Sequence, residues 1–292
     1  MQILKEFDSK VRQIAREGIV AIEDHLGADA AFFYGPIYPS LEKNFRDFIE
    51  DLKNDGSGRK RLVIVINSPG GSAETVEKLV HIIRYHYEEI YFIIPDEAMS
   101  AGTIFALSGD KIFMDYTSSL GPIDPQVHNG KEWVPALGYL DQVEKMIQKS
   151  SDGLLTDAEL VILQNLDLAM LSRYEQAKNL TITLLKEWLV QYKFSDWTKH
   201  QTDQEKLGQP VTIEEKKARA ERIATLLSDN KIWHSHGRKI GVNTLQNYLK
   251  LKIEDYSCDL DFRKKIRSYS EFLTDYINRH GIQSFLHNRI YF

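Results

Sequence analysis

The sequence has little that would mark an exported, membrane-embedded or disulfide-stabilised protein. Its 292 residues include a single cysteine, Cys258, so no disulfide can form within the chain. No apolar run approaches the roughly 18 residues that a membrane-spanning helix requires, which predicts no membrane span. The first residues are charged throughout and lack the apolar segment of a signal peptide. We therefore expect a cytoplasmic protein.

The chain also lacks a strong charge of either sign. Its formal net charge is −5 and its pI is about 6.0, which gives no electrostatic reason to bind nucleic acid. Hydrophobic residues make up 42% and charged residues 27%, an ordinary composition for a globular protein that buries a full core. No internal repeat or low-complexity tract interrupts the sequence. The composition therefore predicts a folded domain and leaves its function open.

Residues 62 to 124 organise the rest of the chain. Residues 62 to 66 read LVIVI, which is typical of a strand buried on both faces of a parallel sheet. Residues 67 to 71 then read NSPGG and end the strand. The adjacent glycines allow backbone angles that other residues avoid and let a backbone N–H approach another group closely. Ser72 can cap an amphipathic helix that follows.

A second turn repeats this pattern at residues 90 to 104. An apolar strand is closed by Pro95, and Ser100 then opens a helix of small and apolar residues. The Ser100 hydroxyl is either an ordinary helix cap or a nucleophile, and spacing alone does not decide between the two. The Ala101 N–H is left free at the helix N-terminus, where the dipole favours negative charge. An acyl-transfer enzyme needs such a hydroxyl beside two unpaired N–H groups.

The residues of these turns resemble a known superfamily. The segments NSPGGS, AMSAGT and SSLGPID resemble the Clp protease proteolytic subunit, signal peptide peptidase A and the crotonases, and within that group the serine dehydrogenase proteinase family. The resemblance implies an α/β fold, a Clp/crotonase-like superhelix of repeated ββα units with a parallel sheet. We expect this domain over residues 29–256, an amphipathic helix within residues 1–28, and a helical extension over residues 257–292.

The resemblance also implies a function. It predicts a serine peptidase that hydrolyses peptide bonds in peptide or protein substrates, without a cofactor or a metal. Ser100 is the expected nucleophile, and the N–H groups of Gly71 and Ala101 are the expected oxyanion hole. The Clp subunit carries its catalytic histidine in the loop after the serine helix, but residues 120 to 124 of that loop read LGPID. His128 is the nearest substitute.

A lysine is the expected general base, as in signal peptide peptidases. Those enzymes carry a catalytic lysine on a helix downstream of the serine, and Lys145 stands 45 residues beyond Ser100 in a segment of helical pattern. Lys149 lies one turn further on the same face and is an alternative, as is His128. A lysine acts as a base only where burial lowers its pKa toward neutrality. The plain interpretation is a solvated lysine with no catalytic role.

Two other functions and one assembly state follow from the same residues. A crotonase-type acyl-CoA enzyme would use the two N–H groups to polarise a thioester, and a catalytically silent scaffold would keep only the fold.

His234 and His236 are spaced like a metal pair, but no Cys, Asp or Glu beside them in the sequence completes a ligand set. Amphipathic segments near both ends, and the aromatic stretch beyond residue 266, predict a homo-oligomer. Residues 156 to 194 predict one long helical pattern.

Overall fold

A six-stranded sheet forms the centre of the molecule. The computed structural model describes residues 2–128, 133–201 and 204–292, without the side chains of residues 2–8, 127, 128 and 133–137. The strand order is β10-β5-β3-β2-β1-β11, and all pairs are parallel except that of β11 with β1. The strands are β1 (Asp29–Tyr34), β2 (Arg61–Asn67), β3 (Glu89–Ile94), β5 (Lys111–Met114), β10 (Glu254–Asp255) and β11 (Phe285–His287).

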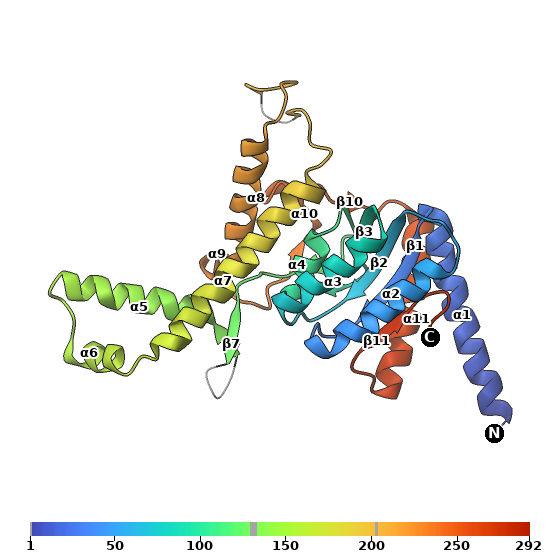
Figure 1. Ribbon diagram of the computed structural model, residues 1–292, viewed down its shortest axis with the longest axis horizontal. Helices are drawn as coiled ribbons and strands as arrows, with labels where there is room; N and C mark the ends of the chain where they lie inside the picture. Colours follow the sequence, from blue (N-terminus) through green and yellow to red (C-terminus); the bar gives the residue numbers. More distant parts are fainter. Residues whose placement is uncertain (1, 129–132, 202–203) are drawn as a thin grey trace.

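Helices cover both faces of this sheet, as Figure 1 shows. Residues such as Phe33 and Ile64 pack into a core formed with α2 (Glu42–Asn54), α3 (Ala73–His86) and α4 (Ala101–Leu107). Their strand neighbours, such as Phe32 and Val65, pack on the other face against α1 (Gln2–Leu26) and α11 (Leu260–His280). Because successive strand side chains point to opposite faces, burial on both sides explains the continuous apolar runs. The predicted α/β class with a mainly parallel sheet is confirmed.

Two smaller strand groups stand beyond the main sheet. The first is a three-stranded sheet of β4 (Glu97–Ala98), β6 (Ser119–Leu120) and β9 (Ile240–Gly241). β4 pairs in parallel with β6, which pairs antiparallel with β9. The second is the antiparallel hairpin of β7 (Gln126–His128) and β8 (Trp133–Pro135). The three-stranded sheet continues from the carboxyl end of β3, so it lies at the edge where parallel-sheet proteins bind ligands.

A helical arm extends from the body of the molecule. It contains α5 (Ala136–Ser151), α6 (Asp157–Gln164) and the first part of α7 (Leu168–Trp188), and Figure 1 shows α5 and α6 projecting away from the sheet. The long helical pattern predicted over residues 156 to 194 is interrupted at this point. The chain breaks between α6 and α7, where the Asp167 side chain accepts hydrogen bonds from the backbone N–H groups of Ala169 and Met170 and so starts a new helix.

The remaining helices follow α7 in the chain, and the first of them packs against α7. They are α8 (Ile213–Ser228), α9 (Asn230–Trp233) and α10 (Val242–Asn247), with a 3₁₀ turn (Pro39–Leu41) before α2 and a π-helical turn (Leu189–Lys193) after α7. Thr212 and Glu215 form a capping box at the start of α8, in which each side chain bonds the backbone N–H of the other residue. Within the described ranges, no helix combines the length and apolar character needed to cross a membrane.

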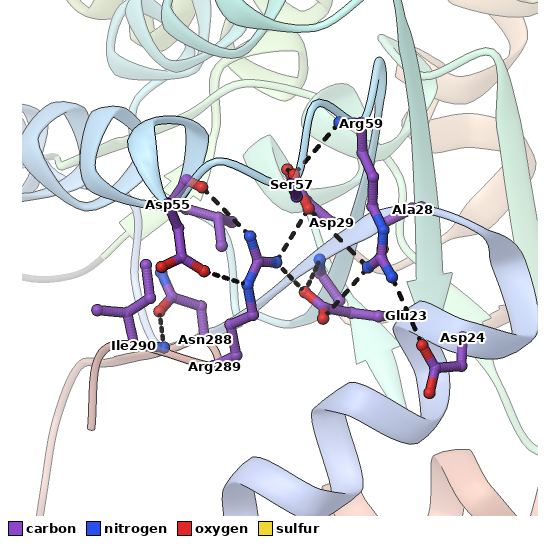
Figure 2. A network of polar contacts seen from close by, with 12 residues as sticks. Glu23, Asp24, Ala28, Asp29, Asp55, Ser57, Arg59, Asn288, Arg289 and Ile290 are labelled. Carbon is purple, nitrogen blue, oxygen red and sulfur yellow. Dashed lines mark hydrogen bonds and ion pairs between the residues drawn. The ribbon is translucent and has the colours of Figure 1, made fainter.

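The C-terminal tail is tied to the first helix and the first strand by an ionic network (Figure 2). Arg289 Nη1 lies 2.5 Å from Glu23 Oε1 and 2.9 Å from Asp29 Oδ1, and its Nε lies 2.7 Å from Asp55 Oδ2. Glu23 is 2% exposed and Asp29 is fully buried. Burial raises the pKa of Glu23, although Arg289 and Arg59 both favour its charged form. The tail therefore supplies the cation that compensates two carboxylates inside the fold.

Candidate active site

The turn after β2 is fixed against its surroundings by hydrogen bonds from both sides. Ser68 Oγ donates to Gly35 O at 2.8 Å and accepts from Gly70 N–H at 3.1 Å. Ile37 pairs with the backbone around Gly71 so closely that a Cβ at Gly71 would lie 2.1 Å from Ile37 O. Only glycine fits there, as the NSPGG pattern predicted. Ser72 then caps α3 by accepting from Thr75 N–H, which confirms the predicted cap.

Ser100 stands at the start of α4 in a strained backbone conformation. Its φ and ψ are 52° and −118°, a region that residues with a side chain rarely occupy. The half-buried side chain makes no capping hydrogen bond to the helix. The interpretation of Ser100 as an ordinary helix cap is therefore wrong. A serine held on a sharp, strained turn between strand and helix is the geometry that exposes a nucleophilic hydroxyl in other hydrolases.

The glycine turn and the serine turn are packed directly on one another. Ser68 N–H donates to Glu97 O at 3.0 Å, and Met99 N–H donates to Ser68 O at 2.9 Å. A Cβ on Gly70 would lie 2.7 Å from Ser100 Cβ and 3.2 Å from Ala101 N. The two turns therefore form one compact unit. Gly71 directly follows Gly70 in the glycine turn, and Ala101 directly follows Ser100 in the serine turn.

Two backbone N–H groups of this unit are unused. In the part of the chain that the structure describes, neither Gly71 N–H nor Ala101 N–H donates a hydrogen bond to another group. Gly71 is exposed, so its N–H is open to a ligand. Ala101 is the first residue of α4, and the helix dipole favours negative charge beside it. Such paired donors can bind the oxygen that becomes negative when a hydroxyl attacks a carbonyl.

A buried carboxylate lies in the loop that follows the serine helix. Asp124 is 1% exposed, and its Oδ1 lies 2.8 Å from Nδ1 of the half-buried His236. The other carboxylate oxygen accepts from Gln126 Nε2 at 2.9 Å. No acidic partner for His236 is evident in the sequence, because Asp124 lies 112 positions away along the chain. Nothing in the local spacing could have revealed this pair.

A family model described as ClpP-like SDH-type serine proteinase matches residues 12–231. The chain belongs to this family. SDH-type proteinases are serine proteinases, so the chain falls within the hydrolases. The resemblance stated from the NSPGGS and AMSAGT segments is thereby confirmed.

Individual relatives of this SDH-type proteinase are distant. An uncharacterised protein of Methanocaldococcus jannaschii is 28% identical over 218 residues, which cover 74% of this chain and 70% of that protein. The 1510-N membrane-bound stomatin-specific protease has a similar structure at 14% identity and a TM-score of 0.45, over 80% of this chain and 82% of its own. ClpP1 from Listeria monocytogenes matches at 13% identity and a TM-score of 0.39, over 79% and 93% of the two chains.

The structure of the SDH-type proteinase places Lys145 on an exposed part of α5, in the projecting arm. Lys149 is exposed as well, and its Nζ lies 2.5 Å from Glu159 Oε1 on α6. By contrast, burial lowers the pKa of Lys193 to about 8, and its Nζ donates to Asp110 O at the amino end of the sheet, opposite Ser100. The backbone of His128 belongs to β7, while its side chain lies outside the described residues.

Proposed function

We propose that this chain is a peptidase that cleaves peptide bonds with Ser100 as its nucleophile. The observation that supports this most directly is the strained, uncapped Ser100 packed against the glycine turn. A hydroxyl in that position attacks a carbonyl carbon, and the carbonyl oxygen becomes negative. The N–H groups of Gly71 and Ala101 are the proposed donors to this oxygen, each contributing about 3 kcal/mol to the transition state.

In the Ser-Lys form of this proposal, Lys145 accepts the Ser100 proton. A lysine must lose its own proton first, which requires a buried setting that favours the neutral amine. The exposed position of Lys145 on α5 does not supply that setting within one chain. Lys145 therefore acts as the base only if a second subunit or a bound substrate covers α5. Lys149 has the same requirement and must also leave Glu159, and His128 is the remaining sequence-based alternative.

We also propose that the chain assembles with copies of itself around peptide or protein substrates. The arm supports this, because α6 buries no side chain and exposes three successive apolar residues, Leu160, Val161 and Ile162. Exposed apolar clusters of this kind are costly in water and mark surfaces that another molecule covers. An assembly through the arm would also change the surroundings of α5.

Labelling with a fluorophosphonate-type probe tests the proposed function. The probe should attach covalently to Ser100 in the wild type, and Ser100→Ala should abolish both labelling and hydrolysis of an unfolded protein substrate. Equal labelling of the two proteins would exclude Ser100 as the nucleophile. A coenzyme A binding measurement on the same samples separates the acyl-CoA alternative, and a folded wild type with neither labelling nor binding would indicate a silent scaffold.

A further inference from the structure

The Asp124–His236 pair is a cluster that the Ser-Lys mechanism leaves unused. Burying a carboxylate is costly unless its oxygens are fully hydrogen-bonded, and both Asp124 oxygens are occupied, by His236 Nδ1 and Gln126 Nε2. His236 is the exposed member of the pair, with about a quarter of its side chain accessible to solvent. A carboxylate can only accept, so the hydrogen bond to Asp124 favours the tautomer with the proton on Nδ1, in which Nε2 of the imidazole is an acceptor.

Strand pairing carries this pair to the neighbourhood of Ser100. Ala98, two residues before the serine, pairs with Leu120 in β6, and Leu120 pairs with Ile240 in β9. Asp124 follows Leu120 by four residues and His236 precedes Ile240 by four, and their side chains meet at 2.8 Å just beyond the paired strands.

The loop that carries Asp124 is also bonded to the serine helix. Thr103, in the first turn of α4, accepts from Gly121 N–H at 2.9 Å and lies 2.7 Å from Ala98 O, to which its hydroxyl donates. A Cβ on Gly121 would lie 2.6 Å from Met99 Cε, so the loop packs tightly against the residue before Ser100. This hydrogen bond and this packing therefore hold the loop against the serine turn.

We propose that His236, oriented by Asp124, is the general base for Ser100. Nε2 takes the hydroxyl proton as Oγ bonds to the carbonyl carbon, and the carbonyl electron pair moves to the oxygen beside the Gly71 and Ala101 N–H groups. His236 then returns the proton to the leaving amine as the C–N bond breaks, and water repeats the sequence on the acyl-enzyme. The inference rests on the proposed function and replaces Lys145 with a residue beyond the family match at 12–231.

The charges around His236 are compatible with this role. Asp124 is its direct partner, and Lys239, which precedes β9, neutralises Glu97 of β4 at 2.8 Å. His234 and Arg238 flank it on its own segment. A histidine base should give a probe-labelling rate that is level at alkaline pH, whereas a lysine base should give a rate that still climbs there.

Probe labelling of His236 variants tests the inference. His236→Gln and His236→Gly should lower the labelling rate of Ser100 by ~10²–10⁴-fold, with unchanged circular dichroism. Added imidazole should restore at least about a tenth of the rate in His236→Gly, which a purely structural histidine would not allow. Asp124→Asn should also lower the rate. His234→Asn is the matched control, since Asn tolerates the φ of 61° at that position, and it should label as the wild type does.

The outcomes separate the two proposals. Wild-type labelling at Ser100 with an unchanged rate in His236→Gln would overturn the role of His236 and leave Ser100 as the nucleophile. Loss of labelling in Lys145→Ala, together with a rate that climbs through alkaline pH, would also overturn it in favour of the lysine. Absence of wild-type labelling would instead overturn the proposed function itself.

Discussion

Gly70 and Ser100 are in direct contact, with no room for a side chain at Gly70. A Cβ there would also lie 2.7 Å from Met99 O, which belongs to the rigid backbone. Gly70→Ala must therefore displace the serine turn, and we expect labelling of Ser100 to fall by at least ~10-fold together with a loss of about 1–3 kcal/mol in unfolding free energy. Probe kinetics and urea unfolding measure the two effects.

Gly58→Ala provides the control for this substitution. Gly58 also has a positive φ, 66°, but a Cβ at this position would meet nothing within 4 Å. The variant should show the backbone penalty of about 1 kcal/mol without any change in labelling. A Gly70→Ala protein that labels at the wild-type rate would show that the two turns tolerate separation.

The strained backbone at Ser100 should lower the unfolding free energy of the wild type. Ser100→Gly removes both the hydroxyl and the strain of a φ of 52°, so we expect it to be more stable than Ser100→Ala by about 1–3 kcal/mol. Neither variant should label. Urea unfolding of the two inactive proteins gives the comparison directly. Equal stabilities would mean that the turn stores no strain.

Arg289 should be among the most costly charged residues to replace. Among the described residues, Arg289→Gln leaves Arg59 as the remaining cation beside the buried Glu23 and Asp29, and we expect a loss of about 3–5 kcal/mol in unfolding free energy. Arg279→Gln removes an exposed pair with Asp275 on α11 and should cost less than about 1 kcal/mol. Similar losses in the two variants would show that the tail network adds nothing beyond a surface ion pair.

The buried imidazole of His287 should make the protein less stable in mild acid. Burial lowers its pKa to about 4, while an unfolded histidine titrates near 6.5. The unfolded chain therefore binds a proton first as the pH falls, and stability should drop by about 3 kcal/mol between pH 6.5 and 4. His287→Gln should flatten this part of the stability profile, whereas His280→Gln at the exposed end of α11 should not. An unchanged slope in His287→Gln would assign the acid sensitivity to other groups.

We expect copies of the chain to assemble through the arm, and a charged side chain introduced there should disrupt the assembly. Light scattering should give the wild type a mass several times 33.7 kDa, and Val161→Glu in α6 should reduce it. Leu207→Glu alters a similarly exposed apolar residue outside the arm and should leave the mass unchanged. A wild type that is monomeric at working concentration would contradict the proposed assembly.

Local chain chemistry predicted the two turns of the candidate site. The apolar strand, the NSPGG turn and the small residues after Ser100 each restrict the backbone within a few residues, so the sequence alone indicated both turns and their free N–H groups. The long amphipathic pattern after residue 156 was less informative, because an Asp167 cap breaks a helix without breaking its apolar periodicity.

Long-range pairing could not be predicted in the same way. The Asp124–His236 contact joins residues 112 positions apart, which lie beside the β6–β9 pairing. The exposure of Lys145 depends on the direction in which α5 leaves the body, which no local pattern encodes. The proposed base therefore changes from Lys145, which was chosen by its sequence spacing from Ser100, to His236, which was chosen by its contact with Asp124.

The pairing of β11 with β1 has a consequence for synthesis on the ribosome. Arg289 is 260 positions beyond Asp29, so β1 and its buried carboxylates emerge long before their partner strand and cation exist. During that interval one edge of the sheet is open, and Glu23 and Asp29 have Arg59 beside them but not yet Arg289. The nascent chain cannot complete its fold in order of emergence, and closure of the sheet is a late event that joins the two most distant strands.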